Sequence, residues 1–170
     1  SLAFTGHDLA WEDHRAVVLS ADAHVDLDDR EFSWVRLRSS GLTLAGQQLT
    51  DMRLSLDGLL RDHGVAFRIG ARDDAVELIG RGAYVDERYA LDIQQIAASG
   101  PRTPPWKLEA PTRLAATADD ADLSPACFVH GARRACIEGR WKRGSDWSIT
   151  AGTQAFPLEA LELKVPGAPR

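Results

Sequence analysis

The chain has 170 residues, a length typical of a single domain. Its 44 % hydrophobic and 26 % charged residues are the composition of a globular protein and exclude a disordered chain. The net charge of −5, from 20 basic and 25 acidic residues, argues against a nucleic-acid-binding protein, because such proteins carry a basic surface. No apolar run approaches the roughly 18 residues of a membrane-spanning helix. No signal-peptide pattern opens the chain. Because the chain lacks an initiator Met and ends in a Pro-rich tail from Val165 to Arg170, we expect a segment of a longer protein.

Apolar and polar residues alternate with a period of two along most of the chain. Between Val17 and Leu27, every odd position is apolar and most even positions are polar. Such alternation is typical of a strand with one buried and one solvated face, since successive side chains point to opposite sides. Further alternating segments begin at the following residues: Met52, Val65, Val76, Leu91, Trp106, Ile137, Trp147 and Leu161.

Turn-forming residues separate these segments and predict how the strands are connected. The predicted turns are Asp28-Asp29, Gly46, Asp57-Gly58, His63-Gly64, Asp73-Asp74, Asp86-Glu87 and Gly144-Ser145. The spacing predicts an all-β chain of roughly a dozen short strands. Connections this short favour an antiparallel meander, since parallel strands need longer crossovers. Only the segment from Pro157 to Leu161 has helical spacing, and it predicts a single helical turn.

The apolar faces of these strands need a cover, and the alternation leaves three arrangements open. Two sheets can pack face to face as a sandwich, or one sheet can close into a barrel. In the third arrangement, a long curled sheet lines a groove with its apolar face and holds an apolar ligand. The sandwich is the commonest of the three among known folds.

The two cysteines, Cys127 and Cys136, are nine positions apart with Gly131 between them. Antiparallel strands joined by a short turn would place them opposite each other, as a disulfide requires. We therefore predict a disulfide, with two buried free thiols as the alternative. A structural disulfide favours an oxidising compartment such as the periplasm.

Possible metal sites in the sequence are weak. Imidazole and carboxylate groups are adjacent at His7-Asp8, Asp13-His14 and His24-Val25-Asp26, but the spacing of a metalloprotease helix is absent. The acidic group of Asp119, Asp120 and Asp122 lacks the ligand order of a calcium loop. We therefore expect no metal site and interpret these residues as surface groups.

Catalytic motifs are equally weak. Gly80-Arg81-Gly82 is half of a dinucleotide-binding motif, without the third glycine or a following helix. Two glycines in a strand instead indicate a bend, a bulge or a close approach. The sequence has no nucleophile elbow around a serine. We expect neither an enzyme nor a cofactor.

Tryptophans in an all-β chain can also form a sugar-binding platform. Trp106, Trp141 and Trp147 fall on the apolar side of their strands, which favours burial over an exposed platform. A β-sandwich sugar-binding domain remains the alternative that these residues allow.

From Gly58 onward, an ordered set of residues resembles the TamB family of bacterial envelope proteins, a branch of the AsmA-like group. The resembling features are Gly58-Leu-Leu-Arg-Asp-His63, the strand from Val65 to Ile69, Leu78-Ile-Gly80, Leu91, the segment from Trp106 through Pro111 to Leu114, Leu123, Cys127, Cys136, Gly139-Arg-Trp141, Trp147 and Pro157-Leu158.

This resemblance implies an elongated antiparallel sheet curled into an open half-pipe with an apolar concave face. Residues 1–57 would be alternating strands of the same groove, 58–165 the family-like segment with the cysteine hairpin, and 166–170 a tail. The groove would be lined by Val17, Leu19, Val25, Leu54, Leu56, Val65, Phe67, Ile69, Val76, Leu78, Leu91, Ile93, Trp106, Leu108, Ile137, Trp141, Trp147 and Ile149.

The resemblance also implies a function. The chain would be a periplasmic segment of an inner-membrane-anchored protein of a Gram-negative bacterium. It would shield phospholipid acyl chains between the inner and outer membranes and act in outer-membrane biogenesis with the barrel partner TamA. The alternative is a chaperone-like module that assists insertion or secretion of outer-membrane β-barrel proteins and autotransporters by pairing their strands with its edge. Neither function uses nucleic acid.

Overall fold

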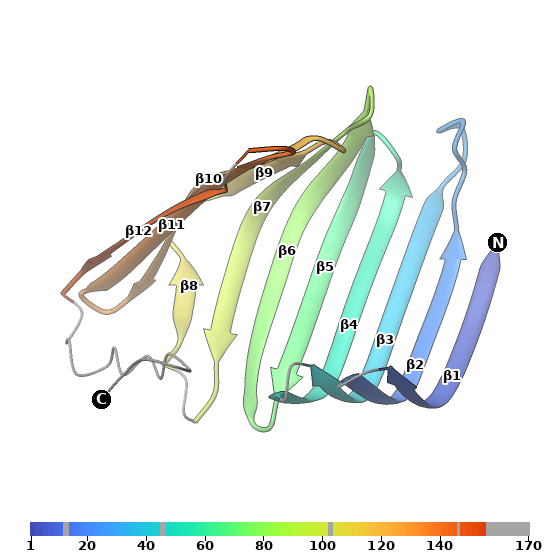
Figure 1. Cartoon of the computed structure of the whole chain (residues 1–170), viewed down its shortest axis with the longest axis horizontal. Helices are drawn as coiled ribbons and strands as arrows, with labels where there is room; N and C mark the ends of the chain where they lie inside the picture. The colour runs from blue at the N-terminus through green and yellow to red at the C-terminus, as the bar shows by residue number, and fades with distance from the viewer. Residues whose placement is uncertain (12–13, 45–46, 102–103, 146, 156–170) are drawn as a thin grey trace.

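The computed structural model describes residues 1–11, 14–44, 47–101, 104–145 and 147–155. These residues form one antiparallel sheet of twelve strands (Figure 1). The described residues contain no helix, and therefore none that could cross a membrane. The strands are β1 (Leu2–Trp11), β2 (His14–His24), β3 (Ser33–Leu44), β4 (Gln47–Leu59), β5 (Asp62–Ala71), β6 (Asp74–Val85), β7 (Arg88–Ser99), β8 (Trp106–Leu108), β9 (Thr112–Ala116), β10 (Asp120–His130), β11 (Arg133–Lys142) and β12 (Ser148–Gln154).

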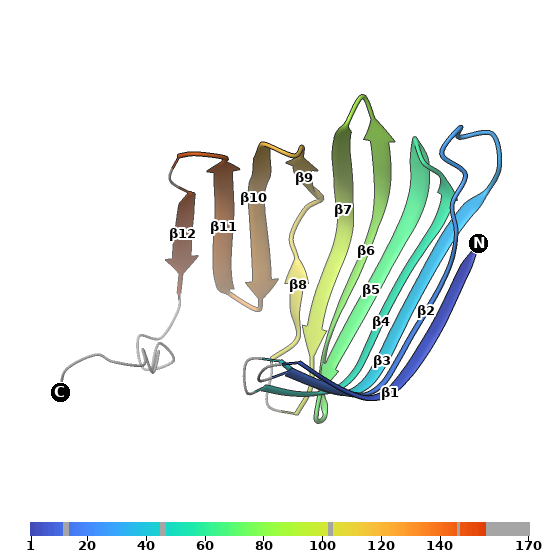
Figure 2. The ribbon, with the colours of Figure 1, turned by 45° about the vertical axis from the view of Figure 1, so that its right-hand side comes forward.

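The strands follow one another across the sheet as a meander. Strands β1 to β7 pair in sequence order, and β10 to β12 continue the order at the other end. The short strands β8 and β9 both lie between β7 and β10, each pairing with a different part of these two strands (Figure 2). Together β8 and β9 act as one strand that is interrupted around Pro111, which has no N–H to donate to the ladder.

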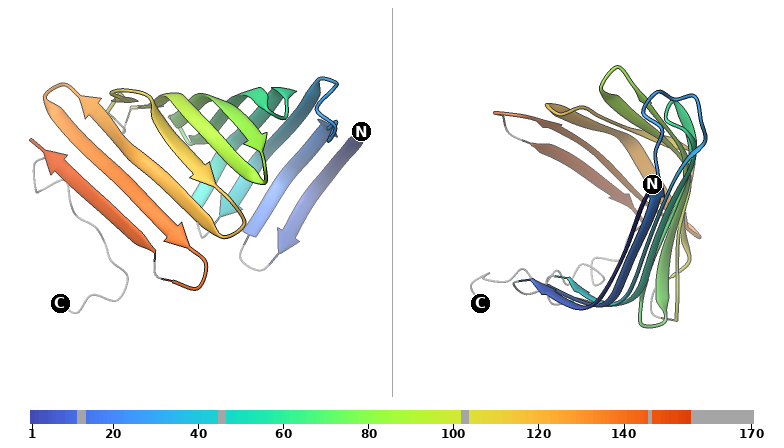
Figure 3. Two further views of the ribbon diagram at one scale, coloured as in Figure 1. Left: turned by 90° about the horizontal axis from the view of Figure 1, so that it is seen from above. Right: turned by 90° about the vertical axis from the view of Figure 1, so that its right-hand side faces the viewer.

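The sheet is a single layer. Every strand-to-strand contact in the described chain joins hydrogen-bonded neighbours, so no strand packs face to face on another. Within the part of the chain that the structure describes, strands β1 and β12 each pair on one side only. The sheet is curved rather than flat (Figure 3). The predicted all-β antiparallel meander is confirmed, and the single layer excludes a sandwich within the described residues. The sheet continues through residues 57 and 58, which lie inside β4.

Several hairpin turns lie where the sequence predicts them. Asp86 and Glu87 connect β6 to β7 with φ angles of 51° and 59°. Positive φ angles at both positions are typical of a two-residue hairpin turn whose twist matches that of the strands. The turn prediction at Asp57-Gly58 and His63-Gly64 is wrong, because these pairs lie inside β4 and β5. Gly58 is needed there for close approach: a Cβ atom on it would lie 2.5 Å from the carbonyl oxygen of Asp62.

Some sequence predictions concern residues that the structure does not describe. They are the turn at Gly46, the helical turn from Pro157 to Leu161, the strand from Leu161 to Val165, and the tail at 166–170.

Strand β2 ends earlier than the alternation predicts, at His24 rather than near Leu27. The carboxylate of Asp26 accepts hydrogen bonds from the backbone N–H groups of Arg30 and Glu31, both at 2.7 Å, and from that of Asp28 at 3.2 Å. These bonds fold the chain into a turn, in which Val25 and Leu27 are exposed. They also lower the pKa of the Asp26 carboxyl group, because they stabilise its ionised form.

This lowered pKa predicts a pH-dependent contribution of Asp26 to stability. The ionised carboxylate stabilises the fold above the ordinary aspartate pKa of about 3.9, and this stabilisation is lost as the pH falls through the lower pKa of the folded state. We expect Asp26→Asn to lower the melting temperature at pH 7, and the difference from wild type to shrink below pH 4. Thermal unfolding followed by circular dichroism between pH 2 and pH 7 measures this. A difference that does not change with pH would contradict the assigned role.

Candidate functional site

The register of the strands gathers apolar side chains on one face of the sheet, here called the apolar face. Directly opposite residues of neighbouring strands share a face. One row of such residues is Leu37, Leu54, Phe67, Leu78 and Ile96, and the next is Val35, Leu56, Val65, Gly80 and Ile93. A third row at the C-terminal end is Leu91, Leu114, Leu123, Gly139 and Ile149. The rows connect strands β3 to β12 in one apolar surface.

Two bulges keep this surface continuous where the alternation breaks. Between β6 and β7 the register shifts after Ile79, so that Ile93 and Ile96 lie on the same face although they are three positions apart. In β10 the register shifts between Leu123 and Ala126, which brings both of these residues to the apolar face. Each bulge absorbs one extra residue, so the apolar side chains on both sides of it face the same way.

A cluster of buried apolar residues lies in the middle of the apolar face. Val65, Leu91 and Ile93 are only 6 %, 8 % and 5 % exposed, although no second layer covers them. Partly buried side chains pack against these three: Leu54, Leu56, Leu78, Tyr89, Ile96, Leu108 and Leu114. The side chains of neighbouring strands therefore cover one another.

The C-terminal end of the apolar face is more open. Trp141 and Ile149 are 40 % and 57 % exposed, and Trp147, just before β12, is 68 % exposed. These three residues, with Leu114 and Leu123, line a shallow hollow of about 320 Å³. The apolar face is thus filled by its own side chains in the middle and open at this end.

The structure brings most of the predicted groove residues onto this face. By register, the apolar face holds Leu19, Leu54, Leu56, Val65, Phe67, Ile69, Val76, Leu78, Leu91, Ile93, Trp106, Leu108, Ile137, Trp141 and Ile149. Of the other three, Trp147 precedes β12, and two lie apart from the cluster. Val17 is 54 % exposed beside Gly41, and Val25 is 43 % exposed in the turn after β2.

Other residues of the apolar face were missed by sequence reasoning. Leu123, Ala126 and Phe128 surround the bulge in β10, where the period of two is interrupted. Ile96 lies beyond the bulge in β7 for the same reason. The signal that could locate the second bulge is Pro125, since proline within a sheet is found mainly at edges and bulges.

One polar pair is built into the rim of the apolar face. The Nδ1 atom of His63 lies 3.2 Å from the carbonyl oxygens of both Leu59 and Leu60, so Nδ1 carries the proton. Its Nε2 atom then accepts a hydrogen bond from the hydroxyl group of Tyr89, at 3.3 Å. Burial raises the pKa of the Tyr89 hydroxyl. Both ring nitrogens of His63 are occupied within the protein, which is typical of a structural histidine.

Gly82 makes room for this pair. A Cβ atom on Gly82 would lie 2.2 Å from Nε2 of His63 and 2.6 Å from the Tyr89 hydroxyl oxygen. Gly80, at the bulge, would bring a Cβ atom within 2.7 Å of the Asp92 carbonyl oxygen. The two glycines of the Gly80-Arg81-Gly82 segment thus serve a bulge and a close approach.

The predicted disulfide between Cys127 and Cys136 is confirmed. The two residues are directly opposite in β10 and β11, with their Cα atoms 4.0 Å apart. Their neighbours Ala126 and Phe128 face the apolar side, so the disulfide lies on the opposite face, here called the polar face. There Nη2 of Arg134 lies 3.2 Å from Sγ of Cys127.

Ion pairs cover much of the polar face. Nε of Arg81 donates to Asp62 at 3.0 Å, which lowers the pKa of the Asp62 carboxyl group and raises that of the guanidinium. Nε of Arg134 donates to Glu109 at 2.9 Å, and Nε of Arg140 to Asp122, also at 2.9 Å. Because these groups are exposed, each pair contributes little to stability, and their main effect is to keep this face solvated.

No group of three or more potential metal ligands gathers among the described residues. Comparisons of the chain with protein-family models, with curated proteins and with solved structures find no match.

The unequal burial of the apolar face predicts unequal mutational effects. Ile93→Ala removes side-chain atoms from the packed middle, and we expect it to lower the free energy of unfolding by about 2–5 kcal/mol. Ile149→Ala changes an exposed position on the same face and should cost less than about 1 kcal/mol. Urea denaturation of the two variants and the wild type measures both. Equal losses of unfolding free energy in the two variants would contradict the difference in packing between the middle and the C-terminal end of the apolar face.

Removal of the disulfide tests its contribution to stability. The bond closes a loop of about ten residues, so we expect the Cys127→Ala/Cys136→Ala variant to lose about 2–3 kcal/mol of unfolding free energy. Urea denaturation gives this value, and the wild type under reducing conditions is the matched comparison. Identical denaturation midpoints for the oxidised protein and the variant would show that the bond does not stabilise the fold.

Proposed function

We propose that the apolar face is the concave lining of an open half-pipe that shields the acyl chains of phospholipids. The chain would be a periplasmic segment of a TamB-like protein anchored in the inner membrane of a Gram-negative bacterium. In this role it would take part in phospholipid transport between the two membranes and in outer-membrane biogenesis, together with the outer-membrane barrel partner TamA.

A single observation carries this proposal: a continuous apolar surface runs across strands β3 to β12, and no second layer of described residues lies over it. A large exposed apolar surface on a soluble protein marks a binding site for something apolar. Transfer of an acyl chain out of water gains about 0.8 kcal/mol for each methylene group that is buried. The exposed parts of the apolar surface provide this gain, with no single deep pocket that would retain the lipid.

The burial pattern supports placing the apolar face on the inside of the curve. On the concave side of a curved sheet, side chains of neighbouring strands converge, and on the convex side they spread apart. Convergence explains how Val65, Leu91 and Ile93 become almost fully buried in a single layer. The charged residues of the polar face would then lie outside, where water solvates them.

Two further features agree with a periplasmic location and with the family. The disulfide between Cys127 and Cys136 is compatible with an oxidising compartment. The ordered motifs from Gly58 to Leu158 resemble the TamB family.

A second function is favoured by the edges of the sheet. Among the described residues, strand β12 pairs with β11 alone. All of its residues are exposed, and its sequence Ser-Ile-Thr-Ala-Gly-Thr-Gln contains neither charge nor proline. Natural edge strands usually carry such groups to prevent pairing with other chains. The alternative proposal is therefore a chaperone-like module that pairs nascent outer-membrane strands with this edge.

Photocrosslinking in cells tests the first proposal. Ile69 lies on the apolar face opposite Met52 and Val76. We expect a photoreactive side chain at position 69 to become labelled with phospholipid, detected through radioactive phosphate. The same probe at position 92 should remain unlabelled, because Asp92 lies on the polar face, opposite Arg81 and Arg113.

A third probe, at Thr153 of β12, distinguishes the alternative. Protein adducts at position 153 without lipid at position 69 would support strand pairing and contradict the lipid groove. Ile69→Arg provides a functional measurement, because an unpaired charge on an apolar wall opposes the passage of acyl chains. Normal envelope integrity with normal levels of this variant would count against lipid transport along this face.

A further inference from the structure

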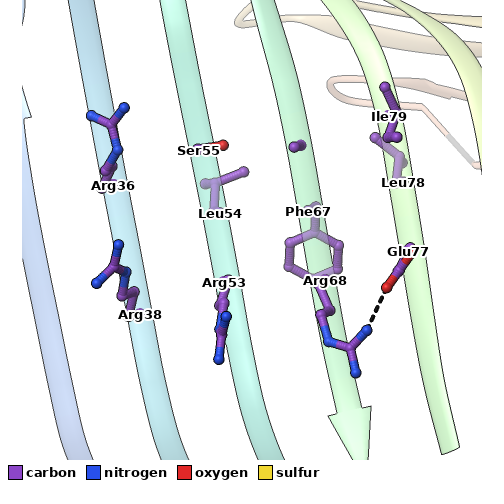
Figure 4. Close-up of a pocket in the computed structure, with 11 residues that line it drawn as sticks. Arg36, Arg38, Arg53, Leu54, Ser55, Phe67, Arg68, Glu77, Leu78 and Ile79 are labelled. Atoms are coloured by element: carbon purple, nitrogen blue, oxygen red, sulfur yellow. Dashed lines mark hydrogen bonds and ion pairs between the residues drawn. The ribbon is translucent and has the colours of Figure 1, made fainter.

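The polar face has a hollow over strands β3 to β6 that the proposed function does not use. It has a volume of about 360 Å³. Arg36 and Arg38 reach it from β3, Arg53 from β4 and Arg68 from β5, with Glu77 from β6 at one end (Figure 4). Four guanidinium groups and one carboxylate therefore lie around one small depression, whose lining also includes the apolar residues Leu54, Phe67, Leu78 and Ile79.

The register explains how the hollow forms. Arg36, Ser55, Ala66 and Ile79 form one row across β3 to β6, and Arg38, Arg53, Arg68 and Glu77 form the next row. Ser55 and Ala66 are short, whereas the side chains around them are long. The small residues are thus the floor of the hollow, and the arginines are its walls.

The arginine row places like charges directly opposite one another. Arg38, Arg53 and Arg68 occupy three adjacent strands in register. Side chains at such positions have Cβ atoms about 5 Å apart, and like charges there destabilise a sheet. A sheet tolerates this arrangement when counterions or a ligand neutralise the charges.

The carboxylates nearby neutralise only part of this charge. Arg36 is paired with Asp57 at 2.6 Å, and Arg68 is paired with Glu77. Asp51 is shared between Arg68 at 3.6 Å and Arg53 at 3.8 Å, which are distances of weak pairs. Arg38 has no carboxylate partner within 4.0 Å among the residues that the structure describes. Arg38 thus has no carboxylate partner there, and Arg53 has only the distant Asp51.

We propose that this hollow is an anion site, in which Arg38 and Arg53 bind a phosphate group above the floor made by Ser55 and Ala66. Guanidinium groups match the oxygens of phosphate geometrically and bind them with charge-assisted hydrogen bonds. Two guanidinium groups on neighbouring strands can both reach one phosphate group, and the Ser55 hydroxyl can donate a further hydrogen bond.

The arginine side chains of this site lie on the face opposite the proposed acyl-chain surface. Leu37 and Leu54 precede and follow Arg38 and Arg53 in their strands, and their side chains point to the apolar face. The single layer of strands separates the two faces. The headgroup of a lipid whose acyl chains lie on the apolar face cannot reach the hollow through the sheet. The anion is therefore either a free phosphate compound or the headgroup of a phospholipid that the polar face contacts from outside.

Binding of inorganic phosphate, measured by isothermal titration calorimetry, tests the site. We expect saturable binding to the wild type, and an increase in the dissociation constant of about tenfold or more in the Arg38→Gln/Arg53→Gln variant. The control is Arg88→Gln, which removes an exposed arginine of β7 outside the hollow. It should bind phosphate within about twofold of the wild type. Thermal unfolding of each variant checks that the sheet is intact.

Flotation with vesicles separates the two sources of phosphate. Phosphatidylcholine vesicles with and without phosphatidylglycerol are compared for the wild type and the same variants. Binding to the anionic vesicles that depends on Arg38 and Arg53 identifies a headgroup, whereas binding of inorganic phosphate alone identifies a soluble ligand. The proposal is overturned if neither probe binds to the wild type, or if Arg88→Gln weakens binding as much as the double variant. Neither outcome bears on lipid labelling at Ile69, which lies on the other face.

Discussion

The structure depends on the requirement that one layer of strands cover its own apolar side chains. In a sandwich, a second sheet removes the apolar face from water, whereas this chain has no second layer among its described residues. Burial must come from neighbouring side chains within the same face. It succeeds in the middle, around Val65, Leu91 and Ile93, and much less around Trp141 and Ile149. The proposed function follows from this shortfall, because a surface that cannot cover itself gains free energy from an apolar ligand.

The sheet is one strand thick, so successive side chains of each strand point to two separate faces. The alternation that directs Leu54 and Phe67 to one side directs Arg53 and Arg68 to the other. The apolar face is suited to acyl chains and the arginine hollow to a phosphate group, and a substitution on one face leaves the chemistry of the other in place. Both faces depend on the same register of strand pairing, since a shift of one residue would move each side chain to the other face. Turns with defined geometry, such as Asp86-Glu87 with both φ angles positive, hold that register.

The bulges limit what the alternation of apolar and polar residues can predict. Strict alternation locates Val65, Phe67 and Ile69 on one face without any structure, and their register with Leu78 and Val76 agrees. It fails at Ile96 and Leu123, because one inserted residue reverses the apparent face of everything that follows. It also extends β2 too far, since the hydrogen bonds of the Asp26 carboxylate to the following backbone outweigh the continuing alternation at Val25 and Leu27. The arginine hollow could not be found in this way. Its arginines are spread over the sequence from Arg36 to Arg68, and only strand pairing brings them together.

The sequence by itself determined the all-β class, the antiparallel meander and the pairing of Cys127 with Cys136, because alternation, short turns and a nine-residue separation are local properties of the chain. Only the tertiary structure decided that the strands form one layer, since the same alternation serves a sandwich, a barrel or an open sheet equally well. It also decided which apolar residues bury one another and which stay open, and it placed Arg38, Arg53 and Arg68 side by side. These outcomes depend on register and curvature, which arise from pairing across the whole sheet and from no single segment of the chain.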